Sequence, residues 1–198
     1  GSSHVQQISH TECYIGGPGE DAVSGSAAVL NSLIAADRLQ DFDVITITGT
    51  GAADLTLPAG FSSGSTLKIF AGAGITSLNL DASALDVNVW ATGSSGDDTL
   101  STGTGTDKLM GLLGDDSLSG GAGDDTLEGG PGGDTLFGGA GSDSLDGGTS
   151  DPINGLLDIA VYSDSTTALN VLVNGTTFSV TASNGVDTLT DIEGLVGS

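Results

Sequence analysis

Residues 93–146 decide the fold, because in consecutive blocks of nine they read GSSGDDTLS, TGTGTDKLM, GLLGDDSLS, GGAGDDTLE, GGPGGDTLF and GGAGSDSLD. Every block has glycine at its fourth position, aspartate at its sixth and leucine at its eighth. A flexible linker would not keep three residue types in register through six copies, so the segment is a structural repeat. The aspartates are Asp98, Asp107, Asp116, Asp125, Asp134 and Asp143, and the leucines are Leu100, Leu109, Leu118, Leu127, Leu136 and Leu145.

Each repeat divides into a turn and a short strand. Glycines at the first, second and fourth positions permit the positive φ angles of a tight turn. The last three residues, such as Thr99-Leu100-Ser101, alternate polar and apolar, as in a strand with one buried face. Such strands are stable only when stacking buries the leucines. The pattern predicts an all-β fold, a right-handed parallel β-roll or solenoid in which two repeats make one turn.

Short apolar pairs continue this rhythm upstream at spacings of 9 to 12 residues. They predict irregular coils of the same solenoid over residues 44–92, before the β-roll of residues 93–150. A separate small β-sandwich is the alternative that such spacing also permits. The pairs are Ile45/Ile47, Leu55/Leu57, Leu67/Ile69, Leu78/Leu80 and Val87/Val89.

The two ends of the chain are expected to cap the roll. Within an N-terminal segment, residues 1–43, we predict a short helix in residues 21–40, with Ser24 or Ser26 as its cap. Its apolar stripe consists of Ala28, Leu30, Leu33, Ile34 and Leu39. Such a helix would cover an exposed strand edge. Past Pro152 the strand-like runs at residues 159–162, 169–173 and 177–181 predict a C-terminal β segment, residues 151–198.

The charge of the chain makes order conditional on a cation. There are 26 acids against 3 bases, a formal net charge of −23, which repels a compact chain unless it is neutralised. This acidity argues against nucleic acid or an anionic membrane as a direct partner. No apolar run approaches the roughly 18 residues of a membrane span. Cys13 is alone, which excludes a disulfide framework within the chain and a cysteine-based zinc site.

Calcium is the cation that the repeats favour. It takes six to eight oxygen ligands from carboxylates and backbone carbonyls, and the repeat offers both. Stacking of coils 18 residues apart pairs Asp98 with Asp116, Asp116 with Asp134, Asp107 with Asp125, and Asp125 with Asp143, which predicts about four ions or more. The glycines expected to offer carbonyl oxygens are Gly96, Gly105, Gly111, Gly114, Gly120, Gly123, Gly129, Gly132, Gly138 and Gly141.

Charge balance in the repeats agrees with that number. Residues 93–146 contain 11 acids and one lysine, a net charge of −10, and about four Ca²⁺ ions would return about +8. Metal binding then supplies the free energy of folding. Acids at the fifth position, Asp97, Asp115 and Asp124, either add outer oxygens or lie at solvated loop tips.

The repeat resembles the RTX (repeats-in-toxin) nonapeptide, G-G-x-G-x-D-x-U-x. The likeness covers 54 of the 198 residues, and only the first three copies depart from the double glycine, at Ser94, Thr102 and Leu112. These departures weaken the case for Asp98 and Asp107 as ligands. The resemblance implies a calcium-binding module of a type I-secreted bacterial protein that crosses the envelope unfolded and folds outside. The tail also resembles segments that follow or separate RTX blocks, and its role as secretion signal or linker stays open.

Two functions fit this resemblance. The first is a non-catalytic structural part of an adhesin, toxin or surface layer, and the alternative is the C-terminal targeting or folding module of a secreted enzyme. Catalysis within the chain is not expected, because His4 and His10 are its only histidines and it has no HExxH or GxSxG motif. A carbohydrate-binding strip is not expected either, since the sequence does not group Trp90, Tyr14, Tyr162, Arg38 and Lys68.

Overall fold

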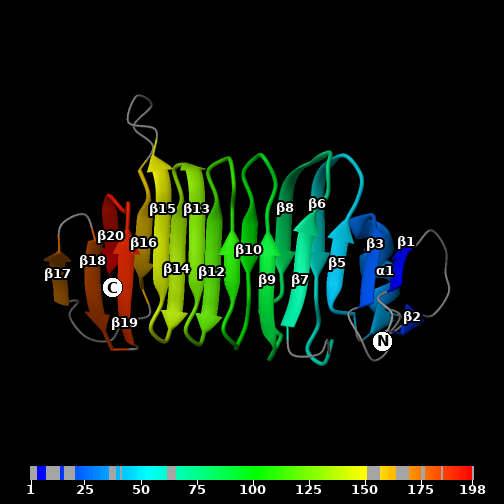
Figure 1. Cartoon of the computed structure of the whole chain (residues 1–198), viewed down its shortest axis with the longest axis horizontal. Helices are drawn as coiled ribbons and strands as arrows, with labels where there is room; N and C mark the ends of the chain where they lie inside the picture. The colour runs from blue at the N-terminus through cyan, green and yellow to red at the C-terminus, as the bar shows by residue number, and fades with distance from the viewer. Residues whose placement is uncertain are drawn as a thin grey trace.

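Consecutive strands of the chain alternate between two main sheets and stack along the long axis of the molecule (Figure 1). The computed structural model describes residues 4–7, 14–15, 21–35, 39–40, 42–61, 66–150, 157–163, 170–174, 177–183 and 185–197. From β1 to β16 the order of the strands along the axis follows the sequence, as the change of colour from blue to yellow in Figure 1 shows, whereas the eleven-stranded sheet ends in the order β15, β19, β18, β17. The predicted parallel β-solenoid is confirmed.

The described strands belong to three sheets. The eleven-stranded sheet contains, in spatial order, β1 (His4–Gln7), β3 (Asp21–Gly25), β5 (Val44–Ile47), β7 (Thr66–Ala71), β9 (Asn88–Thr92), β11 (Lys108–Met110), β13 (Thr126–Gly132), β15 (Ser144–Ser150), β19 (Gly185–Thr190), β18 (Thr177–Ala182) and β17 (Asn170–Asn174). The seven-stranded sheet contains β20 (Gly194–Gly197), β16 (Ile159–Tyr162), β14 (Thr135–Ala140), β12 (Ser117–Ala122), β10 (Thr99–Ser101), β8 (Ile75–Asp81) and β6 (Gly51–Thr56). A small sheet pairs β2 (Tyr14–Ile15) with β4 (Leu39–Gln40).

The repeat leucines form the core between the two main sheets. Leu100, Leu118 and Leu136 are paired in register in one sheet, and Leu109, Leu127 and Leu145 in the other. None of the six side chains is more than 1% exposed. Burial of each stabilises the fold by roughly 1.5–3 kcal/mol, which explains why the eighth position is apolar in every copy.

The coils upstream of the repeats belong to the same solenoid, so the β-sandwich alternative is wrong. Strand β5 pairs in parallel with β7, β7 with β9, and β9 with β11. The step between paired residues is 24 from Val44 to Lys68, 22 from Lys68 to Trp90, and 18 from Trp90 to Lys108. The predicted apolar pairs are buried, except that Val87 is only partly buried. In that coil the two buried residues are Val89 and Ala91.

The repeat strands are longer than predicted in the second half of the roll. Strands β10 and β11 have the predicted 3 residues, whereas β12 and β14 have 6 and β13 and β15 have 7. The extension arises because the double glycine of the following repeat also pairs with the coil 18 residues away, as in Gly121 with Gly139. In these coils the double glycine therefore belongs to the strand, and the division of each repeat into a glycine turn and a three-residue strand does not hold.

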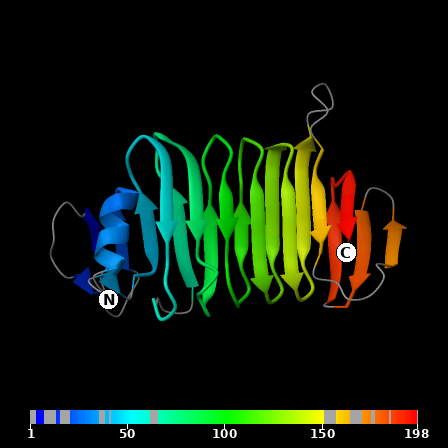
Figure 2. The same ribbon diagram turned by 180° about the vertical axis from the view of Figure 1, so that it is seen from behind.

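The helix is shorter than the predicted stretch and covers the edge of the seven-stranded sheet (Figure 2). Helix α1 (Ala27–Ala35) begins after Ser26, whose carbonyl oxygen accepts the Leu30 N–H at 2.9 Å. Its buried residues are Leu30, Leu33 and Ile34; Ala28 is exposed, and Leu39 belongs to β4. The Asn31 side chain donates to the Asp54 carbonyl oxygen (2.7 Å) and accepts the Thr56 N–H (3.1 Å). The Asn31 side chain thus satisfies backbone groups of β6 that a further strand would otherwise bind at this edge of the sheet.

At the C-terminal end the coils lengthen and the sheet is closed by antiparallel strands. Thr135 of β14 pairs with Ile159 of β16, and Ser144 of β15 pairs with Thr188 of β19, steps of 24 and 44 residues. Strands β18 and β17 then add antiparallel to β19. Antiparallel strands thus end the eleven-stranded sheet, whereas the division of the chain at residues 43, 92 and 150, with a C-terminal capping segment, stays a prediction. Pro152 lies outside the described residues.

Candidate metal centre

The six repeat aspartates form two columns inside the solenoid. Each aspartate directly precedes the strand of its repeat, so alternate aspartates follow alternate sheets. None of the six is more than 3% exposed. The first column consists of Asp98, Asp116 and Asp134, and the second of Asp107, Asp125 and Asp143.

In each column, the second and third aspartates accept a backbone N–H from the preceding coil through one carboxylate oxygen. The Asp98 N–H donates to Asp116 Oδ1 and the Asp116 N–H to Asp134 Oδ1, both at 2.8 Å. In the second column, the Asp107 N–H donates to Asp125 Oδ1 at 2.8 Å and the Asp125 N–H to Asp143 Oδ1 at 2.9 Å. All four predicted pairs of aspartates are therefore brought together.

The other carboxylate oxygen is buried and lacks a hydrogen-bond partner among the described residues. This holds for the Oδ2 atoms of Asp107, Asp116, Asp125 and Asp134. A buried polar atom without a partner costs about 1–3 kcal/mol, and a charged one costs more. A row of such oxygens is stable only when protons or cations bind it.

The first-position glycines leave room beside these oxygens. A Cβ built on Gly111 would overlap Asp116 Oδ2, and one on Gly120 or Gly129 would overlap the Oδ2 of Asp125 or Asp134. A Cβ built on Gly138 would likewise overlap Asp143 Oδ2. A side chain at this position would therefore fill the space in front of the carboxylate that a cation needs.

The fourth-position glycines set the distance between coils. Gly123 has φ +128°, and a Cβ on it would overlap the carbonyl oxygen of Gly105, one coil away. Gly132 has the same relation to Gly114, and Gly141 to Gly123, while Gly96 approaches the Thr76 carbonyl oxygen. Gly105, Gly114, Gly123, Gly132 and Gly141 have positive φ angles, and Gly96 has the close backbone contact without one, so each of the six positions favours glycine.

Asp98 differs from the other aspartates. The Ser94 hydroxyl, at the second position of the first repeat, donates to Asp98 Oδ1 at 2.8 Å, and the Ser94 N–H donates to Asp98 Oδ2. The Leu78 N–H also donates to Asp98 Oδ1. Its two oxygens are thus bound by the protein itself, which supports the weaker case for Asp98 as a ligand. In the second repeat, the Thr102 hydroxyl donates to the Gly120 carbonyl oxygen at 2.7 Å, and it also lies near enough to Asp107 to lower the pKa of that carboxyl.

Burial makes these carboxyl groups retain protons when no metal is bound. Burial, together with the smaller effect of neighbouring carboxylates, raises the pKa of Asp116 and Asp125 to about 7 and that of Asp134 to about 6. The N–H of the preceding aspartate opposes the shift in each case by stabilising the anion. Burial also raises the pKa of Asp107.

Acid is therefore expected to stabilise the metal-free fold and to weaken cation binding. With pKa values above the unfolded value of about 4, the folded chain binds more protons, so this stabilisation is complete below about pH 4 and is lost as pH rises through about 7. A cation must displace these protons, so calcium affinity should fall on the order of tenfold from about pH 7.5 to about pH 5.5. Titration calorimetry at both pH values tests this, and equal affinities would contradict it.

The donor set fits a hard divalent cation. Within the described part of the chain, no three His, Cys, Asp or Glu side chains converge on one point. A cation in either column must therefore take carboxylates from neighbouring coils and complete its shell with backbone carbonyl oxygens. Calcium accepts such irregular all-oxygen shells, whereas magnesium demands near-octahedral geometry and resists dehydration.

The fifth-position aspartates tie neighbouring loop tips together. Asp97 Oδ1 accepts the Asp115 N–H and Asp115 Oδ1 accepts the Gly133 N–H, both at 3.0 Å, while Asp124 Oδ1 accepts the Ser142 N–H at 2.9 Å. All three aspartates are exposed, as expected of loop tips. The bonds between coils were not foreseen from the sequence.

Two buried aspartates outside the repeats, which were not predicted from the sequence, continue the columns. Asp158 is 0% exposed and Asp187 is 2% exposed. The Asp134 N–H donates to Asp158 Oδ1 at 2.8 Å, and the Asp143 N–H donates to Asp187 Oδ1 at 2.9 Å. A local signal existed for one of them, because residues 185–189 read GVDTL, which matches positions four to eight of the repeat.

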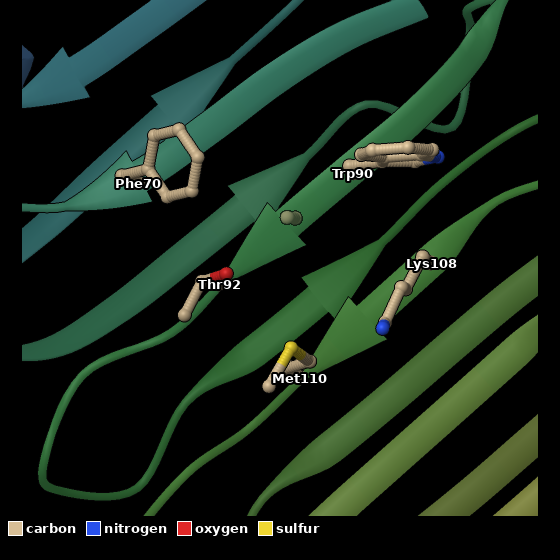
Figure 3. A pocket seen from close by; sticks show the side chains of 6 residues that line it. Phe70, Trp90, Thr92, Lys108 and Met110 are labelled. Carbon is tan, nitrogen blue, oxygen red and sulfur yellow. The ribbon is translucent and has the colours of Figure 1, made fainter.

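Aromatic and basic side chains that the sequence does not group meet on the outer face of the eleven-stranded sheet (Figure 3). Register places Lys68, Trp90 and Lys108 in one row across β7, β9 and β11. Trp90 is 48% exposed and helps to line a hollow of about 410 Å³. The other lining residues are Phe70, Ala91, Thr92, Lys108 and Met110. Tyr162 is buried, and His10 and Arg38 lie outside the described residues.

Comparison with known proteins identifies the repeats. Residues 92–127 and 119–151 match the family model of the RTX calcium-binding nonapeptide repeat (4 copies). The matched residues include all six blocks and both columns except Asp158 and Asp187. No curated protein matches the chain. In the residues that the structure describes, no helix is long and apolar enough to cross a membrane.

Proposed function

We propose that this chain folds by binding calcium between its coils. Residues 92–151 match the RTX calcium-binding nonapeptide repeat, whose β-roll is a structural calcium-binding module and not a catalytic fold. The observation that carries the proposal is the row of buried Oδ2 atoms that no described group binds. Cations placed there remove the cost of burying these carboxylates and hold adjacent coils together.

The proposed ligands are the paired aspartates together with carbonyl oxygens of the turns. Asp107, Asp116, Asp125 and Asp134 have the orphaned oxygens, and Asp143 has the same position in the second column. The first- and fourth-position glycines would supply carbonyl oxygens, because they have no side chain of their own to crowd these oxygens. The four pairs within the repeats give at least about four ions.

We propose that the chain is a structural segment of a larger secreted or surface protein. RTX repeats occur in secreted bacterial proteins, and they bind calcium. A chain with net charge −23 should stay extended where calcium is scarce and fold where it is plentiful. Such a segment can therefore cross a narrow secretion channel before it folds. The same route is compatible with the alternative function, a C-terminal targeting or folding module of a secreted enzyme.

Replacement of a column aspartate should weaken calcium binding much more than replacement of a loop-tip aspartate. Asp125→Ala removes one buried ligand shared by two neighbouring pairs, and we expect a loss of affinity of at least about tenfold or loss of ions from the stoichiometry. Asp97→Ala removes an equal charge from an exposed position and should change affinity less than about threefold. Isothermal titration calorimetry compares them, and equal effects would refute the ligand assignment.

A further inference from the structure

The first column does not end with the last matched repeat. Asp134 pairs onward with Asp158, whose Oδ1 accepts the Asp134 N–H at 2.8 Å, as Asp134 Oδ1 accepts the Asp116 N–H. Strand β16, which follows Asp158, pairs in parallel with β14, so that Ala160 takes the place of the core leucine. Residue 158 thus occupies the sixth position of a degenerate seventh coil that contains six extra residues (24 minus 18).

The Asp158 carboxylate has the same unfilled environment as the aspartates of the matched repeats. Its side chain is 0% exposed, and its Oδ2 has no hydrogen-bond partner among the described residues. The Oδ2 of Asp134, one coil away and also 0% exposed, is likewise without a partner in the described part of the chain. Two adjacent buried carboxylates therefore face a region that no described hydrogen-bond donor occupies.

A glycine and a backbone carbonyl also border this region. Gly147 has the first position of the seventh coil, and a Cβ on it would lie 2.6 Å from Asp158 Cβ and 2.8 Å from Asp158 Cγ. The same Cβ would overlap the Asp191 carbonyl oxygen, which therefore borders the same small space. Gly147 therefore lies against the Asp158 side chain as Gly111 lies against that of Asp116, although a Cβ on Gly147 would meet Cβ and Cγ of Asp158 whereas one on Gly111 would meet Oδ2 of Asp116 first.

Three carboxylates surround Asp158, as many as surround Asp116 or Asp125 in the matched repeats. The carboxylates of Glu193, Asp191 and Asp146 all lie near enough to raise its pKa, after burial, which is the larger cause. Glu193 also accepts the Asp158 N–H at 2.9 Å and so continues the column by one more coil. Ligand charge is a main determinant of calcium affinity, so the position favours a divalent cation strongly.

We propose a calcium site between Asp134 and Asp158, formed by their carboxylates with the Asp191 carbonyl oxygen, outside the matched repeats. The site rests on the proposed function, because it uses the same cation and the same kind of donor. It connects the last matched coils to residues 185–197, because Asp191 directly follows β19 and Glu193 directly precedes β20. Calcium would then hold the C-terminal cap on the roll.

Calcium titration of the whole chain tests this site. Asp158→Asn, which keeps the size of the side chain, should lower the stoichiometry by one ion, whereas Asp86→Asn, which removes an equal charge from an exposed position, should leave it unchanged. Unchanged stoichiometry in Asp158→Asn would overturn the site without touching the proposed function. Absence of calcium binding in the unaltered chain would overturn both.

Crystals of the unaltered chain give a second test, which does not depend on the folding of a variant. Grown with terbium in place of calcium, they should show an anomalous peak between the carboxylates of Asp134 and Asp158. Peaks between Asp116 and Asp134 but none at Asp158 would show that the ions stop with the matched repeats, and the proposal would be wrong.

Discussion

Removal of calcium at neutral pH is expected to abolish the β-structure of the roll. The buried carboxylates of both columns would then have to stay ionised without a counterion or bind protons, and either state opposes folding near pH 7.5. Far-ultraviolet circular dichroism should lose its strand signal in excess chelator. The radius of gyration should rise at least roughly twofold, toward the about 48 Å expected of an unfolded chain of this length.

The controls for this prediction separate calcium coordination from charge screening. Magnesium at the same concentration should not restore the strand signal, because it does not accept the irregular oxygen shell. Potassium chloride at equal ionic strength screens repulsion between exposed charges but cannot satisfy buried Oδ2 atoms, so it should restore little. A strand signal that survives chelation would show that the columns are stable as protonated pairs and would contradict metal-dependent folding.

The nine-residue period explains why so much of the roll could be predicted from the sequence. A strict period fixes the step between stacked coils at 18 residues. It therefore also fixes which residues are neighbours in adjacent coils, such as Leu118 with Leu100 and Asp116 with Asp98. The chemistry of the column followed from the same register. The strand alternation placed the leucine inward, and the core confirms it.

The contacts that could not be predicted are those between coils that are not 18 residues apart. Asp158 and Asp187 are displaced by steps of 24 and 44 residues, so no period relates them to the repeats. Trp90 lies beside Lys68 only because the coil between them has 22 residues, a length that composition does not determine. The bonds of Asn31 to the edge of β6 depend on the docking of the helix, which is a tertiary contact between segments 23 to 25 residues apart.

Gly123→Val is expected to be the most destabilising single change in the roll. Residue 123 has φ +128°, where a β-branched residue is strained, and its Cβ would overlap the Gly105 carbonyl oxygen of the adjacent coil. Strain and overpacking together should cost about 3–5 kcal/mol. At roughly 2–4 °C for each kcal/mol in a chain of this size, the melting temperature in saturating calcium should fall by about 10 °C or more.

Gly133→Ser is the matched control for this change. Residue 133 is at the fifth position of its repeat, where other copies have Thr106 or Ser142, and its φ is not positive. Its N–H, which Asp115 Oδ1 accepts, remains in the serine variant, so the change should lie within about 0.5 kcal/mol of the unaltered chain. Both variants are compared by thermal melting followed by circular dichroism. If Gly123→Val melted at the same temperature as Gly133→Ser, adjacent coils would not be in backbone contact at position four, and the spacing that brings the aspartates together would be wrong.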